Sequence, residues 1–176
     1  MVSWEETLRA VVRRYYRSGT LDPPDWVTEG SSTAPEPLTV NNAMCGDRVV
    51  AYVEHLPRSA DAPARIWLDV AGCAICKASG EMACRAAEVL TAQELAQFAR
   101  EMCAWMEGPD GSGDPQDTRH RPLSEVTPIG GSPQLPTAAI PAEDIAAMAR
   151  LREVPGRRRC ASLPWEAVRR VLDTSR

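Results

Sequence analysis

NNAMCGDR, residues 41–48, joins two apolar, β-branched segments of the chain and places a cysteine two positions before an aspartate. Gly46, which separates Cys45 from Asp47, can adopt backbone conformations that other residues avoid. A tight turn at this glycine lets the thiol and the carboxylate point at one metal ion. The stretch therefore predicts a turn between two strands that carries two metal-binding groups side by side.

Three short segments around this turn have the pattern of strands. They are LTV (38–40), RVVAYVEHL (48–56) and ARIWLDV (64–70), which are rich in β-branched residues. The segment between the second and the third, PRSADAP, is short enough for a hairpin-like connection, and this favours antiparallel pairing. We therefore expect a small antiparallel three-stranded sheet.

Helices are predicted before and after these strands. Two of them begin with a capping box, formed by Ser3 with Glu6 and by Thr91 with Glu94. The predicted helices cover residues 3–17, 73–90, a segment that starts at Thr91 and continues through Trp105, 141–154, and 162–175, the last capped by Ser162. The order of helix, strands and helices predicts an α+β fold with the helices on one face of the sheet.

The length of 176 residues suits one domain with a buried core. We therefore expect a single domain over residues 1–176. Residues 108–137 are dense in glycine, proline and polar side chains and have no sustained periodicity. Such a composition is typical of an insertion without helices or strands of its own.

Charge and hydropathy argue against two classes of partner. The net charge is −4 and no basic cluster dominates, so we expect no nucleic-acid binding. The apolar runs are too short to span a bilayer and the first residues lack the pattern of a signal peptide, so we expect a cytoplasmic protein without a membrane partner. Thiols stay reduced in the cytoplasm, and six cysteines therefore need a role other than disulfide bonding.

The cysteines divide into two groups by their predicted positions. Three lie at the ends of elements, namely Cys45, Cys73 and Cys160. Three lie inside predicted helices, namely Cys76, Cys84 and Cys103. Functional side chains gather on loops at the ends of elements, whereas cysteines on helix faces are typically small buried residues. The first group is therefore the candidate for chemistry.

These three cysteines and the nearby aspartate supply three thiolates and one carboxylate, the number of ligands in a tetrahedral Zn²⁺ site. The predicted ligands are Cys45, Asp47, Cys73 and Cys160. The start of a helix favours the thiolate of Cys73. The carboxylate is the hard donor among soft sulfurs and is the easiest to displace. The set predicts a metal centre that can exchange a ligand.

Three arginines, Arg157, Arg158 and Arg159, directly precede Cys160. Three thiolates and a carboxylate carry more negative charge than Zn²⁺ offsets, so a cationic rim is expected. We expect these arginines to lower the pKa of Cys160, with Arg159 as the residue that tunes the site. The alternative is a run of solvated charges with no role at the centre.

Three segments together resemble the SufU/IscU/NifU N-terminal family of iron–sulfur cluster scaffold and sulfur-acceptor proteins. NNAMCGDR resembles its Asn-x-Pro-x-Cys-Gly-Asp signature, and AGCAICKASGEM (71–82) resembles its Gly-Cys-x-Ile-Ser-x-Ala-Ser helix start. VPGRRRCASLPWEAV (154–168) resembles the third segment in its SufU-type form, Pro-x-Arg-x-x-Cys-Ala-x-Leu-x-Trp. The resemblance covers nearly the whole chain outside residues 108–137 and is closest to the SufU branch.

The resemblance implies a role in sulfur trafficking. A cysteine desulfurase of the SufS type would offer a persulfide, and a downstream recipient would take the sulfur or the cluster. The family's metal ligands fall on the same four residues, with Zn²⁺ as the expected ion in SufU types. There the thiolate that attacks the persulfide corresponds to Cys45. In IscU types the same ligands hold iron or a [2Fe–2S] cluster, and the last cysteine, here Cys160, receives the persulfide.

Four functions remain open from the sequence. The first is a sulfur acceptor for iron–sulfur cluster assembly or a related thiolation, which as an enzyme would be a zinc-dependent sulfurtransferase. The second is a scaffold for a transient [2Fe–2S] cluster. The third is a structural zinc protein that binds partners, although structural zinc sites usually close with Cys or His rather than with a residue like Asp47. The fourth is a redox-sensing dithiol formed by Cys73 and Cys76.

Two departures from the family pattern bear on these alternatives. Cys76 stands where the family has serine and, three residues after Cys73, shares its helix face. It is either a small buried residue or an extra ligand or resolving thiol. The chaperone-recognition sequence of IscU-type members has no counterpart, since REVPGRRR occupies that place, and this favours the SufU-type interpretation.

Overall fold

The computed structural model of the chain describes residues 3–16, 23–29, 35–54, 63–107 and 140–174. The element order is α1 (Trp4–Tyr15), α2 (Asp25–Thr28), β1 (Leu38–Asn42), β2 (Asp47–Val53), β3 (Ile66–Ala71), α3 (Ala74–Val89), α4 (Ala92–Glu107), α5 (Ala142–Ala149), the 3₁₀ helix η2 (Arg150–Glu153) and α6 (Pro155–Thr174). The predicted insertion at 108–137 lies outside the described residues.

The three strands form one sheet in the order β1-β2-β3, with both neighbouring pairs antiparallel. The register places Asn42 opposite Asp47 at the turn between β1 and β2, and Arg48 opposite Ala71 at the end of β3. The predicted α+β fold with a small antiparallel three-stranded sheet is confirmed. The end of the sheet at this turn is where the predicted metal ligands begin to gather.

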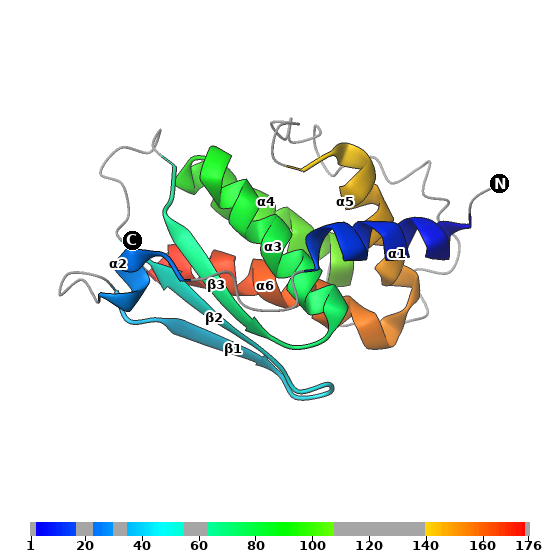
Figure 1. Cartoon of the computed structure of the whole chain (residues 1–176), viewed down its shortest axis with the longest axis horizontal. Coiled ribbons are helices and arrows are strands. Elements are labelled where there is room, and N and C mark those ends of the chain that lie inside the picture. The colour runs from blue at the N-terminus through cyan, green and yellow to red at the C-terminus, as the bar shows by residue number, and fades with distance from the viewer. Residues whose placement is uncertain (1–2, 17–22, 30–34, 55–62, 108–139, 175–176) are drawn as a thin grey trace.

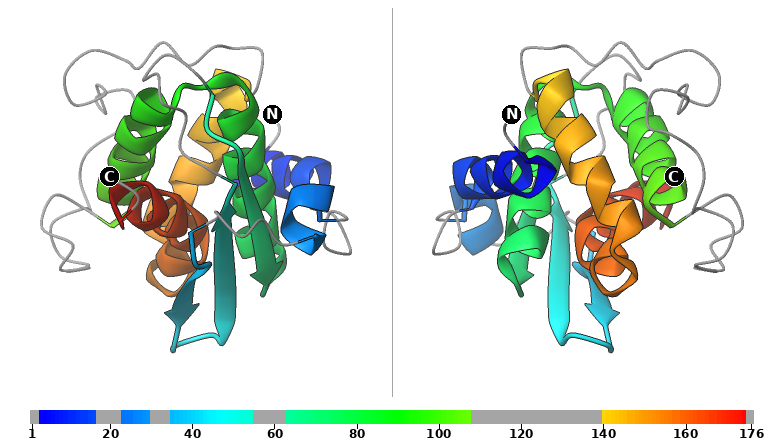
Figure 2. Two further views of the ribbon diagram at one scale, coloured as in Figure 1. Left: turned by 90° about the vertical axis from the view of Figure 1, so that its left-hand side faces the viewer. Right: turned by 90° about the vertical axis from the view of Figure 1, so that its right-hand side faces the viewer.

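Helices α3 and α6 pack against the sheet, and α4 packs on α6 while α1 packs on α3 (Figures 1 and 2). Side chains at alternate positions of β2, such as Val49 and Ala51, are fully buried in the core. Trp165 of α6 is also fully buried, and Phe98 of α4 meets its ring edge-on at 5.0 Å between centroids. The core therefore lies among the sheet, α3, α4 and α6.

A buried carboxylate ties α5 to α1. Asp144 is 1% exposed and accepts hydrogen bonds from Arg14 Nη1 at 2.6 Å and from the Tyr15 hydroxyl at 2.8 Å. Burial and the hydrogen bond to Asp144 raise the pKa of Tyr15 to about 12. Because an unpaired buried carboxylate would be costly, these partners fix the position of α5 on α1.

Most predicted elements are found close to their predicted bounds. The capping boxes of Ser3 with Glu6 and of Thr91 with Glu94 are both present as hydrogen bonds. The helix predicted over 141–154 divides into α5 and the 3₁₀ helix η2. No helix among the described residues is long and apolar enough to cross a membrane.

The last helix begins seven residues earlier than predicted, and the prediction that Ser162 caps it is wrong. Pro155 occupies the first helical position, which suits a residue without an N–H group. Ser162 lies inside the helix, where its hydroxyl donates to Glu107 at 2.5 Å. The helix also continues through Pro164. Cys160 therefore lies within α6 and not on a loop ahead of it.

Close packing between α3 and β3 depends on a glycine. A Cβ atom at Gly80 would lie 2.6 Å from Val70 Cγ2, whereas a Cβ atom at Gly156 of α6 would meet no atom within 4 Å. Alanine gains about 1 kcal/mol of helix propensity over glycine. Overpacking a core typically costs about 1–3 kcal/mol.

We expect Gly80→Ala to lower the free energy of unfolding by up to about 2 kcal/mol, because overpacking outweighs the gain in helix propensity. Chemical denaturation measures this change. Gly156→Ala serves as the control and should leave stability equal or higher. The double variant Gly80→Ala with Val70→Ala should recover part of the loss, and equal stability of the two alanine single variants would contradict the packing argument.

Candidate metal centre

The turn between β1 and β2 has the geometry that the sequence predicts. Gly46 has a φ of +74°, and its N–H donates to the Asn42 carbonyl oxygen at 2.9 Å. No other glycine among the described residues has a positive φ. Cys45 is exposed on this turn, while Asp47, the first residue of β2, is 2% exposed. The turn therefore leaves Cys45 accessible from solvent and turns its carboxylate inward.

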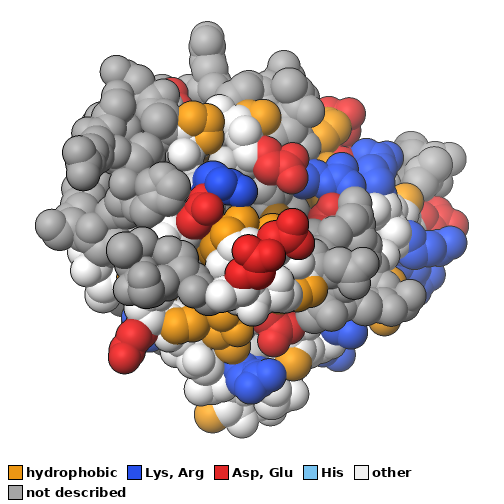
Figure 3. All heavy atoms as spheres, turned by 60° about the vertical axis from the view of Figure 1, so that its left-hand side comes forward, with side chains coloured by type: hydrophobic (Ala, Val, Ile, Leu, Met, Phe, Trp, Pro, Cys, Tyr) orange, Lys and Arg blue, Asp and Glu red, His pale blue; other side chains and the backbone are white. Residues whose placement is uncertain are grey.

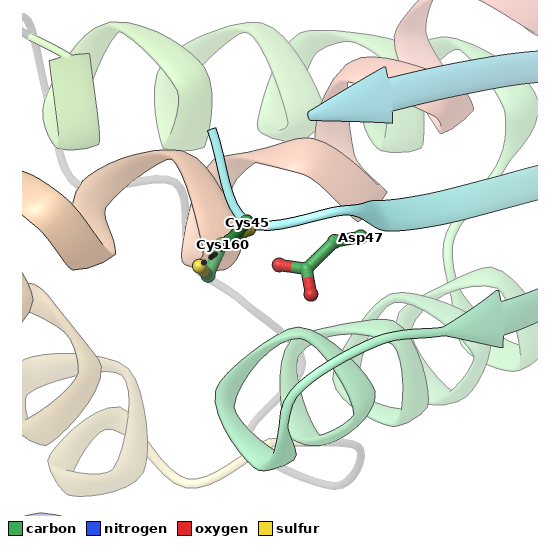
Figure 4. A group of neighbouring side chains, drawn as sticks. All are labelled: Cys45, Asp47 and Cys160. Carbon is green, nitrogen blue, oxygen red and sulfur yellow. Dashed lines mark hydrogen bonds between the residues drawn. The ribbon is translucent and has the colours of Figure 1, made fainter. Parts of the chain in front are cut away.

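Three of the four predicted ligands converge. The ligand atoms of Cys45, Asp47 and Cys160 all lie within 4.8 Å of one another. The two sulfur atoms are 3.5 Å apart, and Figure 4 shows them facing each other from the turn and from α6, with the carboxylate beside them. Segments more than a hundred positions apart in the sequence thus form one site.

Cys73, the fourth predicted ligand, lies next to the carboxylate and is not part of the group of three. It is the N-cap residue of α3, as the sequence predicts for a thiol at a helix start. Its backbone N–H donates to Asp47 Oδ1 at 2.9 Å, and its Sγ lies 3.9 Å from Asp47 Oδ2. Asp47 therefore stands between the Cys73 thiol and the pair of sulfurs.

The electrostatics of the site favour an ionised carboxylate. Burial raises the pKa of Asp47, but hydrogen bonds from Cys45, from the Cys73 N–H and from Cys160 together outweigh it, and the net pKa is lowered. The positive end of the α3 dipole adds to this preference for negative charge. Asp47 is thus available as an oxygen ligand at neutral pH.

Cys160 behaves differently from our expectation. It is fully buried in α6, and burial is the main cause that raises the pKa of its thiol, the direction opposite to the one predicted from the neighbouring arginines. The Arg159 guanidinium pairs instead with Glu107 at 2.9 Å and with Glu166. The pair with Glu107 joins α6 to α4 beside Cys160, and the pair with Glu166 lies within α6. Tuning of the site by Arg159 remains a prediction.

The other three thiols are not members of the convergent group, although Cys76 is close enough to Asp47, Cys73 and Cys45 to interact with their charges. Cys76 is fully buried in α3, and burial raises the pKa of its thiol, which keeps it neutral. Cys84 is buried, and Cys103 is half-buried with its Sγ 3.9 Å from the Ser162 carbonyl oxygen. Burial also raises the pKa of Cys103, to about 12. These environments suit small buried residues, which is one of the two interpretations that the sequence left open for Cys76.

The donor set fits a tetrahedral Zn²⁺ or iron site. Two thiolates bound to one Zn²⁺ at ~2.3 Å lie ~3.8 Å apart, close to the 3.5 Å between the sulfurs of Cys45 and Cys160. Asp47 can supply an oxygen within 4.8 Å of both sulfurs, and Cys73 Sγ lies 3.9 Å from the other carboxylate oxygen, Asp47 Oδ2. Cys45, Asp47, Cys73 and Cys160 are therefore the residues that would hold a metal.

The sequence did not single out two residues that shape this site. The buried Asn42 side chain donates to Cys45 Sγ at 2.8 Å, and no spacing rule identifies an amide beside a sulfur. Gly72 precedes Cys73, and a Cβ atom there would lie 2.5 Å from Asp47 Oδ1. The one feature of the sequence that could have identified Gly72 is its position directly before Cys73, at the start of α3.

No family model and no curated protein matches this chain. Solved structures do match it. A NifU-like protein (N-terminal) from Brucella abortus superposes with a TM-score of 0.59 at 17% identity, covering 98% of this chain and 97% of that one. A protein described as hypothetical gives a TM-score of 0.56 at 20% identity, covering 94% and 96%.

A third crystal structure comes from Fervidobacterium islandicum AW-1 and is described as a candidate iron–sulfur cluster assembly scaffold protein for the SUF system. It superposes with a TM-score of 0.53 at 18% identity, covering 92% of this chain and 93% of that one. This chain has the SufU/NifU fold. The fold expected from the resemblance is confirmed, and the SufU branch is not distinguished from the NifU-like one.

The close approach of Gly72 to Asp47 predicts a change in stability that can be measured in the metal-free protein. Gly72→Ala should displace the carboxylate from the Cys73 N–H and lower the free energy of unfolding by about 1–3 kcal/mol, the cost of leaving a buried polar group unpaired. Denaturation of the metal-free protein measures it. In an Asp47→Ala background the same change should cost much less, because the clashing carboxylate is gone. Equal costs in the two backgrounds would refute this account.

Proposed function

We propose that this protein is a sulfur acceptor for iron–sulfur cluster assembly or a related thiolation. In this proposal Cys45 takes persulfide sulfur from a cysteine desulfurase, at a metal centre held by Cys45, Asp47, Cys73 and Cys160. The sulfur then passes to a downstream recipient. In this role the chain acts as a zinc-dependent sulfurtransferase that works together with the desulfurase.

The convergence of Cys45, Asp47 and Cys160 is the observation that carries this proposal. Two thiols and an ionised carboxylate from three separate segments form a donor set that suits zinc and iron. A purely structural zinc site is a poorer account, because it would close with Cys or His and would bury its ligands. Here one ligand is a carboxylate and one thiol, that of Cys45, is exposed.

Sulfur transfer to Cys45 moves one sulfur atom from the persulfide of the desulfurase cysteine to the Cys45 thiol. The Cys45 thiolate attacks the outer sulfur of the desulfurase persulfide, a new S–S bond forms on Cys45, and the S–S bond on the desulfurase breaks. The desulfurase cysteine leaves as a thiolate, so no outside oxidant or reductant is consumed. The attack requires a thiolate that the partner can reach, and the exposed turn provides the access.

The residues around Cys45 divide the remaining work. Bound Zn²⁺ would keep the coordinated thiols deprotonated at neutral pH. Asp47, held by the Cys73 N–H and buried, supplies negative charge on the inner side of the site. Cys160 stays buried behind the turn, so a large partner can reach Cys45 first.

Assembly of a transient [2Fe–2S] cluster on the same four ligands is the second candidate. It is favoured by the described role of the structural neighbour from Fervidobacterium, a candidate iron–sulfur scaffold. Both functions use the same side chains. They differ in whether the protein holds its cargo as a persulfide on Cys45 or as an iron–sulfur cluster.

Metal analysis of protein purified without oxygen separates the two functions. We expect a colourless protein with about one bound zinc per chain, and Asp47→Ala should lower zinc affinity at least about tenfold because a charged ligand is lost. A brown protein with charge-transfer absorption, containing iron and sulfide, would support the scaffold instead. If Asp47→Ala bound zinc as tightly as wild type, the Asp47 carboxylate would not be a zinc ligand.

Sulfur uptake by Cys45 is tested with a purified SufS-type desulfurase. The wild-type chain should raise desulfurase turnover and gain the mass of one sulfur atom, located on Cys45 by peptide mapping. Cys45→Ser should abolish both effects. Cys103→Ser is the matched control, since it removes a thiol of α4 outside the site, and it should behave as wild type. Sulfur uptake by Cys45→Ser at the wild-type rate would overturn the proposal.

A further inference from the structure

Asn42 occupies a position that neither the motif nor the ligand set explains. It is the last residue of β1, lies opposite Asp47 in the sheet and is 4% exposed. Its side-chain nitrogen donates to Cys45 Sγ at 2.8 Å and lies 4.0 Å from Cys160 Sγ. One amide group therefore reaches both sulfur atoms of the convergent site.

The oxygen of the same side chain has a separate task. Asn42 Oδ1 accepts a hydrogen bond from the Met44 N–H at 3.2 Å, which stabilises the turn that carries Cys45. An asparagine amide offers two N–H donors and one acceptor oxygen. Asn42 thus fixes the turn with its oxygen and directs both of its donors to the sulfurs. The role of the amide oxygen and the role of the amide nitrogen can be tested separately by substitution.

An N–H donor matters here because the site concentrates negative charge. Thiolates removed from water need donors or cations close by, and hydrogen bonds to charged acceptors are the strong ones. The arginine expected to serve this purpose, Arg159, pairs with Glu107 and Glu166. The neutral amide of Asn42 is the side-chain donor that the structure places on Cys45 Sγ.

We propose that Asn42 is a positioning residue of this metal centre. Its amide holds the sulfurs of Cys45 and Cys160 toward one ion and, through the shorter contact, draws electron density from Cys45. Cys45 is then the weaker of the two sulfur donors and the one that leaves most readily. This inference rests on the metal centre of the proposed function and adds a residue that selects the thiol to be released.

Asn42→Asp separates this role from a structural one. The aspartate keeps an oxygen for the Met44 N–H and has the same size, but it replaces the donor with an anion. Asn41→Asp is the matched control, because it makes the same chemical change at the exposed neighbouring residue. Any effect of added charge alone should therefore appear in both variants.

The measurement is zinc competition against a chelator, together with the sulfur-to-cobalt charge-transfer spectrum of the Co²⁺-loaded protein. Asn42→Asp should lower zinc affinity roughly 10–100-fold and shift the charge-transfer bands, as loss of an outer-shell partner does. Asn41→Asp should stay within about twofold of wild type, as surface changes do. A merely structural role would lower thermal stability and leave the band positions unchanged.

Two results would overturn the inference. One is a zinc affinity and cobalt spectrum of Asn42→Asp that match those of Asn41→Asp. The other is a wild-type chain that takes up neither zinc nor cobalt. These measurements involve no desulfurase, so tight zinc binding without sulfur transfer would refute the proposed function and leave the role of Asn42 intact.

The wild-type chain provides a second measurement if Asn42→Asp does not fold. Its ¹⁵N-labelled form should show the side-chain amide signals of Asn42 shifting on zinc addition, while those of Asn41 stay in place. The Asn42 signals should also differ between wild type and Cys45→Ala in the metal-free protein. Unshifted Asn42 signals in both comparisons would remove the contact on which the inference is built.

Discussion

The hydrogen bond from the Cys73 N–H to Asp47 joins the two halves of this site. It connects the first residue of β2 to the N-terminus of α3, at a point where Gly72 leaves room for the carboxylate. The bond satisfies a backbone donor that the helix itself cannot pair, and the helix dipole favours the ionised acid. The turn that carries Cys45 is thereby held at a fixed distance from α3.

Helix α6 completes the arrangement from the other side. The Ser79 hydroxyl of α3 donates to the Ala161 carbonyl oxygen at 2.6 Å, directly after Cys160 in the chain. Arg159 and Ser162 both bind Glu107 at the end of α4. These contacts fix the rotation of α6 about its axis, so that Cys160 faces the turn. Figure 3 shows acidic, basic and apolar side chains interspersed among the coloured residues of the face that it draws.

The sequence predicted those parts of the fold that depend on interactions between residues close together in the chain. Helix α3 starts directly after its N-cap residue Cys73, and the turn places Cys45 beside Asp47, because capping, glycine and β-branched patterns act over a few residues. The start of α6 was missed because Ser162 followed by Pro164 has the pattern of a helix N-terminus, whereas Arg159 and Ser162 contact Glu107 of α4, which is distant in the sequence. Asn42 was missed for a related reason, since its contact with Cys45 depends on the exact shape of the turn.

The contrast in burial between Cys45 and Cys160 bears on the sulfur transfer proposed above. Cys45 is exposed beside Met44, a large apolar side chain that is 93% exposed, while Cys160 is completely buried 3.5 Å behind it. A protein partner can approach the turn and cover Met44, which gives apolar area for binding next to the reactive thiol. Cys160 has no exposed surface, so a partner's persulfide could reach it only after the residues that cover it had moved. In the function proposed above, the exposed Cys45 is therefore the residue that would receive sulfur, and the buried Cys160 would serve as an inner ligand of the same site.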